Sequence, residues 1–102
     1  MKYHLVLQFP GDSRNDLEAL LALEDRLIGS LEPEHVVDGH DVGSGEGNIF
    51  IHSDNPSAAF ELARPLIPSA MFCDLKAAYR EAAGQRYSML WPPNSLGPFE
   101  VK

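Results

Sequence analysis

The sequence holds a single cysteine, few basic residues and no long apolar run, and each shortage excludes a class of protein. Cys73 has no partner for an intrachain disulfide, which excludes a disulfide scaffold and mildly favours a reducing cytosol. No stretch approaches the ~20 apolar residues of a membrane helix, so we expect no membrane partner. The apolar run within residues 1–10 is too short for a signal peptide, and we expect a cytoplasmic protein.

Basic residues are outnumbered, because 8 Lys and Arg stand against 15 Asp and Glu, for a net charge of −7. The imbalance is uneven: residues 1–62 hold 12 acids and 3 bases, and residues 63–102 hold 3 acids and 5 bases. Nucleic acid is a poor partner for the acidic part, since phosphate binding relies on Lys and Arg. A basic protein suits it better as a partner, with simple solubility as the alternative interpretation of the charge.

What the sequence does hold is the composition of one globular domain. Its 102 residues are 44% hydrophobic and 23% charged, which is typical of a single folded domain and far from a disordered chain. We expect one domain over residues 1–91, followed by an irregular C-terminal tail over residues 92–102.

Alternation of apolar and polar side chains predicts the first strands. Residues 3–9 alternate, with Val6 the one apolar residue among His4, Val6 and Gln8, and this pattern places the other face of the strand in the core. Residues 35–42 and 48–52 are predicted to be two further strands, joined by the glycine-rich loop 43–47. This loop joins a strand to a strand and no Lys follows it, so we interpret it as a hairpin connection and not as a phosphate-binding loop.

Two helices are predicted from their start signals. Ser13 followed by Asp16 is an acidic variant of the capping box and predicts a helix over residues 13–28, with Gly29 as its C-cap. Capping side chains followed by Pro56 predict that a second helix begins near this proline.

The apolar residues of 70–83 fit a helix and the buried side of a strand equally well. We predict a strand over residues 71–80, because a helix there would leave two helices back to back and the sheet short of a member. Cys73 then lies on the buried side of this strand, where its thiol gives no support to nucleophilic catalysis. A last strand is predicted over residues 87–91.

The element order is therefore β-α-β-β-α-β with an additional C-terminal strand. In this order the chain resembles small ferredoxin-like bacterial proteins, including ACT-type and dimeric α/β-barrel modules, over residues 3–91. The resemblance implies an α+β, ferredoxin-like βαββαβ sandwich, in which two helices cover one face of an antiparallel sheet. It is a resemblance of element order, so no functional residue is carried over. In size and acidity the chain is also similar to the immunity proteins that neutralise bacterial toxins.

Strand pairing in this fold is expected to form two rows of side chains on the sheet face away from the helices, which we call the open face. The predicted histidine row is His4–His52–His40, and the predicted apolar row beside it is Val6–Phe50–Val42. Opposed side chains in such rows are only ~4.5–5.5 Å apart at Cβ, close enough to share a metal ion or a proton. These are the candidate binding residues, and the three histidines are the candidate metal ligands.

Three interpretations of the open face stay open. The histidines are ordinary solvent-facing polar residues, or they line the rim of a homodimer in which a second copy covers the apolar row. In the third interpretation they bind a transition metal or act as acid–base groups. A register slip of one residue would send these side chains to the other face, so the last two interpretations depend on the pairing.

Our leading hypothesis is a non-catalytic protein that forms a homodimer or binds a partner, in an unknown pathway. A toxin-neutralising, immunity-type inhibitor is one version of it, and no cofactor is expected. The alternative is a small enzyme or a metal- or ligand-binding regulatory domain that uses the histidines of the open face.

Overall fold

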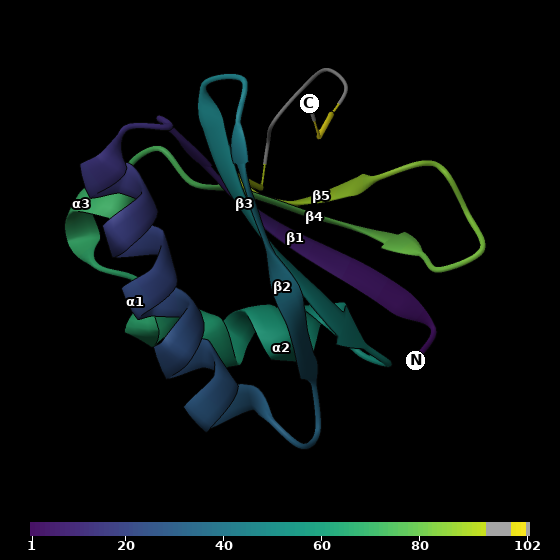
Figure 1. Cartoon of the computed structure of the whole chain (residues 1–102). Coiled ribbons are helices and arrows are strands. Elements are labelled where there is room, and N and C mark those ends of the chain that lie inside the picture. The colour runs from purple at the N-terminus through teal and green to yellow at the C-terminus, as the bar shows by residue number, and fades with distance from the viewer. Residues whose placement is uncertain (94–98, 102) are drawn as a thin grey trace.

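The computed structural model describes residues 1–93 and 99–101 and shows an α+β fold built on one antiparallel sheet (Figure 1). The five strands lie in the order β2-β3-β1-β4-β5. They are β1 (Tyr3–Pro10), β2 (Val36–Gly43), β3 (Glu46–Ser53), β4 (Lys76–Glu81) and β5 (Ser88–Trp91). The helices are α1 (Arg14–Leu31), α2 (Pro56–Ala63), the 3-10 turn η1 (Arg64–Leu66) and α3 (Ser69–Phe72). The predicted α+β class and antiparallel sheet are confirmed.

The core lies between one face of the sheet and the helices that cover it (Figure 1). Alternate residues of β1 and β3 point into it, and α1 supplies a stripe of leucines at helical spacing. The largest buried side chains are Leu5, Leu7, Leu20, Leu23, Leu27, Leu31, Ile49 and Ile51. Each such side chain contributes about 1.5–3 kcal/mol when it leaves water, so this layer is the main source of stability.

Helix α1 begins as predicted and ends later than predicted. The Ser13 hydroxyl accepts from the backbone N–H of Asp16, and the Asp16 carboxylate accepts from the backbone N–H of Ser13, which completes the capping box. The prediction that Gly29 caps the C-terminus is wrong, because the helix continues to Leu31. Leu31 is 1% exposed, and burying its side chain outweighs the weak helix preference of the glycine.

The predicted strand over residues 71–80 is wrong in its first half. The chain forms α3 after Pro68, and β4 begins only at Lys76. Met71 and Phe72 pack against the core from this short helix, which extended backbone would not allow. Cys73 is the C-cap of α3 and is exposed, so its predicted burial is wrong as well.

The glycine-rich loop forms the tight hairpin between β2 and β3. Gly43 pairs with Glu46, and the two residues between them, Ser44 and Gly45, have φ angles of 54° and 82°. Positive φ at both central residues is the geometry of a two-residue turn that matches strand twist. Further along β2 the pairing shifts between Val37 and Gly39, so Asp38 is an extra residue in a β-bulge.

The predicted C-terminal tail lies in part outside the described residues. Within 99–101, the Glu100 carbonyl accepts from Gln8 Nε2 at 2.8 Å, and the Phe99 ring centroid is 5.0 Å from that of Tyr87. Gln8 alternates with the core residues of β1, so this end of the chain lies against the open face. Within residues 1–93 and 99–101, no helix is both long enough and apolar enough to cross a bilayer.

Candidate functional site

The pairing of β1 with β3 on the open face is as predicted. His4 pairs with His52, and Val6 pairs with Phe50. The two imidazole rings stack, with centroids 4.3 Å apart and planes inclined by 25°. His52 Nε2 also lies 3.4 Å from Asp38 Oδ2, so the bulge residue of β2 extends the row.

His40 and Val42 do not lie on the open face, and their predicted positions are wrong. β2 pairs Val42 with Gly47 and His40 with Ile49, whose side chain is buried in the core. The predicted pairing of Val42 with Phe50 is off by three residues, and an odd shift exchanges the faces of a strand. The shift arises from the turn: the predicted register needs a longer loop between the strands, whereas the structure joins them by the two residues Ser44 and Gly45.

His40 contacts helix α1 and has no contact with the other histidines of the predicted row. Its Nδ1 lies 3.1 Å from both carboxylate oxygens of Glu24. The Glu24 side chain is only 13% exposed, so this pair fastens the middle of α1 to the edge strand β2. His4, His40 and His52 therefore do not form the predicted metal site. Among the residues that the structure describes, no group of three or more His, Cys, Asp or Glu could hold a metal ion.

His4 is held in its neutral form by its surroundings. Burial is the main cause that lowers its pKa below the ordinary value of 6.5, and positive charge on His52 and Arg80 lowers the pKa further. Asp38 acts in the opposite direction but does not reverse the shift. A neutral His4 can stack on His52 without charge repulsion, which favours a structural role for the stack near pH 7.

The apolar part of the open face is already buried within one chain. Val6 is 1% exposed, Ala78 beside it is fully buried, and Phe50 is half-buried. A second copy would therefore find little apolar surface to cover here. The reason for predicting a homodimer through this face was the burial of its apolar row, and that burial is already present in the single chain.

A buried polar cluster, which we did not predict, continues the same face. Gln8 Nε2 donates to Glu46 Oε2 and to Asn48 Oδ1, at 3.0 Å in each case. Asn48 Nδ2 in turn donates to Glu46 Oε2 at 3.1 Å. The register that pairs His4 with His52 also pairs Gln8 with Asn48, so extending the predicted row by four residues would have found this pair.

The strongest concentration of charge is the acidic surface, which we define as residues 14–43. This segment spans α1, the connection and β2, and its eight acids and two bases give a net charge of −6. On α1, Leu17, Leu21, Glu24 and Ile28 recur at the spacing of one helix side. Leu21 is 37% exposed and Ile28 is 41% exposed, so an apolar stripe runs through the acidic surface. We call Leu21 and Ile28 the apolar stripe.

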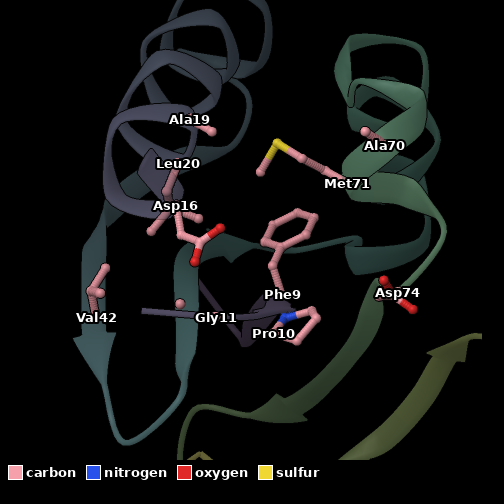
Figure 2. Close-up of a pocket in the computed structure, with 11 residues that line it drawn as sticks. Phe9, Pro10, Gly11, Asp16, Ala19, Leu20, Val42, Ala70, Met71 and Asp74 are labelled. Atoms are coloured by element: carbon pink, nitrogen blue, oxygen red, sulfur yellow. The ribbon is translucent and has the colours of Figure 1, made fainter. Parts of the chain in front are cut away.

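A cavity of about 200 Å³ opens between the first turns of α1 and the short helix α3 (Figure 2). We call it the α1–α3 cavity. Phe9, Leu20 and Met71 form apolar walls, while Asp16 and Asp74 contribute carboxylates from opposite sides. The cavity could not be predicted from the sequence, because one wall is α3, where a strand was predicted.

No protein-family model, no curated protein and no solved structure matches this chain.

A buried Ser–His contact resembles a catalytic pair only in composition. His35 Nδ1 lies 2.7 Å from Ser53 Oγ, and Ser53 Oγ accepts from the backbone N–H of Asn55 at 2.8 Å. Ser53 is fully buried and His35 is 6% exposed. A substrate has no access to this hydroxyl, so the contact joins the start of β2 to the end of β3 and has no catalytic role.

Proposed function

We propose that the chain is a non-catalytic binding module whose acidic surface takes a basic protein partner. The observation that carries this proposal is the coincidence of charge and apolar area on residues 14–43. The segment that holds Leu21 and Ile28 carries a net charge of −6, and these two side chains are among the most exposed large apolar ones of the described residues.

The two parts of this surface support different aspects of binding. The acidic residues steer a basic partner during encounter and discriminate against acidic proteins. The apolar stripe supplies affinity, because covering the exposed remainder of Leu21 or Ile28 contributes about 1 kcal/mol each. The stripe and most of the charges lie on α1 and β2, with Glu32 and Glu34 in the connection, so little ordering is needed on binding.

A second copy of the chain is not the partner that we propose. Two acidic surfaces that each carry −6 would repel one another, and the apolar row of the open face is already buried. A toxin with a basic surface, of the kind that immunity-type inhibitors neutralise, is one partner of the required chemistry. We further propose that the fold is ferredoxin-like, which the position of β3 between β1 and β2 supports.

The test uses a synthetic amphipathic peptide of about 18 residues, five helical turns, with lysines on one face and leucines on the other. Its scrambled sequence, which lacks the leucine face, is the matched probe. Binding is measured by fluorescence anisotropy at about 0.15 M salt, and the site is mapped by amide chemical shifts. We expect the shifts to gather on α1 and β2 and the scrambled peptide to bind more weakly.

Variants separate the apolar stripe from general charge attraction. The double variant Leu21→Ser/Ile28→Ser removes about 2 kcal/mol of contact, so Kd should rise about 30-fold. Leu62→Ser is the matched control, since Leu62 is 45% exposed on α2, outside the acidic surface. Equal affinity for the two peptides, or an equal effect of the control, would contradict the proposed surface.

A further inference from the structure

The α1–α3 cavity is lined from β1, α1 and α3, and one of its carboxylates is held in place before any ligand arrives. Figure 2 shows the Phe9 ring between the two helices, Met71 reaching across from α3, and the Asp16 carboxylate pointing toward Phe9 from α1. Asp16 Oδ2 accepts from the backbone N–H of Ser13 at 3.1 Å and from the Ser13 hydroxyl at 2.7 Å. This carboxylate is therefore held in place by the capping box.

The volume of the cavity sets the size of what it can hold. At about 200 Å³ it is smaller than the pockets that take drug-sized molecules. It is larger than an apolar cavity of ~150 Å³ that binds benzene. One ring, or one short branched chain, therefore fits between the apolar walls.

The charge of the lining selects the polar group of the ligand. Among the described residues, no Lys, Arg or His lines the cavity, whereas Asp16 and Asp74 do. Asp16 Oδ1 and the whole Asp74 carboxylate have no hydrogen bond or ion pair within residues 1–93 and 99–101. The N-terminal end of α1 would attract an anion, but its capping box already places a carboxylate there.

We propose that the α1–α3 cavity binds a small ligand that carries an ammonium group on a compact apolar body. The apolar body lies against Phe9, Leu20 and Met71, and the ammonium group faces the carboxylates of the lining, Asp16 and Asp74. A free amine and the N-terminal residue of a peptide both have this chemistry. A free amino acid does not, since its carboxylate would lie beside the two aspartates. This inference does not rest on the proposed binding of a basic protein, although Asp16 belongs to the acidic surface as well.

The experiment compares three probes that share a phenyl ring and differ in their polar group: benzylamine, benzyl alcohol and benzoate. Each is titrated into the full chain, and binding is followed by amide chemical shifts and by the melting temperature. We expect benzylamine to bind with a Kd on the order of 1 mM, a value suited to so small a ligand. Benzyl alcohol should bind about threefold to fivefold more weakly, because it lacks the ion pair, and benzoate should not bind.

Two variants connect the binding to this cavity. Asp74→Asn should raise the Kd of benzylamine about threefold to fivefold and leave that of benzyl alcohol unchanged. Asp25→Asn, which changes an exposed acid of α1 outside the cavity, is the matched control and should change neither. Ala19→Leu places a larger side chain in the lining and should abolish binding of both probes. Its unchanged melting temperature would show that the fold is kept.

A further comparison distinguishes a peptide N-terminus from a free amine as the ligand of the cavity. A short peptide amide that begins with leucine is compared with its N-acetylated form. Tighter binding than benzylamine, lost on acetylation, would assign the site to a chain N-terminus, and weaker binding would assign it to a free amine. Binding of benzoate, shifts outside the cavity, or no binding of any probe at about ten times the expected Kd would overturn the proposal.

Discussion

The turn that connects β1 to α1 depends on Gly11, and replacing this residue is a direct test of the structure around the α1–α3 cavity. Gly11 has a φ angle of +100°, which side chains rarely adopt, and its N–H donates to the Gly45 carbonyl at 2.7 Å. A Cβ atom added at Gly11 would lie 2.4 Å from Asp16 Oδ2. In Gly11→Ala, therefore, the backbone is strained and the carboxylate of the capping box has to move.

The two effects add to give the expected loss in the free energy of unfolding. The strained backbone conformation costs about 1–3 kcal/mol, and loss of the cap costs about 1 kcal/mol. We expect Gly11→Ala to lower the free energy of unfolding by about 3 kcal/mol. For a domain of this size, the corresponding fall in melting temperature is about 12–24 °C.

Gly29→Ala is the matched control. Gly29 lies inside α1, and no atom lies within 4 Å of a Cβ added there. Alanine is the better helix former, so this variant should be more stable than the wild type by about 0.5 kcal/mol. Both variants are measured by urea unfolding monitored by circular dichroism. A loss of less than about 1 kcal/mol in Gly11→Ala would contradict both the strained backbone at Gly11 and the position of the Asp16 carboxylate beside it.

Three further predictions concern the sheet and the core. Burial and positive neighbours lower the pKa of His4, so the unfolded chain takes up this proton more readily than the folded chain does. The contribution of a neutral His4 to the free energy of unfolding is therefore present above pH ~6.5 and is lost as the pH falls through the lowered pKa. In urea unfolding between about pH 7.5 and 5, His4→Gln should lose less stability than the wild type does. Gln8→Ala leaves the buried Asn48 Oδ1 without its donor and should lower the free energy of unfolding by about 2 kcal/mol. The control Gln85→Ala, at an exposed position, should lower it by no more than about 0.5 kcal/mol. Leu23→Ala empties a fully buried position and should cost about 3 kcal/mol; a loss below about 1 would show that this helix face is not in the core.

Elements that depend on local chemistry could be predicted from the sequence. The alternation in β1 and the capping box at Ser13 involve neighbours along the chain, and the structure has both. The pairing of His4 with His52 could also be predicted, because a slip of one residue would move the core side chains of either strand to the open face.

The remaining features could not be predicted, because the local sequence there is compatible with more than one structure. The glycine-rich loop allows turns of different length, and only the positive φ angles at Ser44 and Gly45 select the two-residue turn that sends His40 to the helix face. Residues 70–83 have no strong local preference, so packing of Met71 against the core decides in favour of α3. The α1–α3 cavity follows from that decision, which is why the candidate site differs more from its prediction than the fold does.

The bulge at Asp38 has a consequence for the behaviour of the chain at high concentration. β2 is an outer strand of the sheet, and an unbroken outer strand is a template for fibrillar stacking of one molecule on the next. The extra residue interrupts the regular ladder, and the Glu32 carboxylate occupies the Val37 N–H at 3.1 Å. Edge-to-edge polymerisation through β2 is thereby discouraged, because an incoming strand would find neither a regular ladder nor a free Val37 N–H.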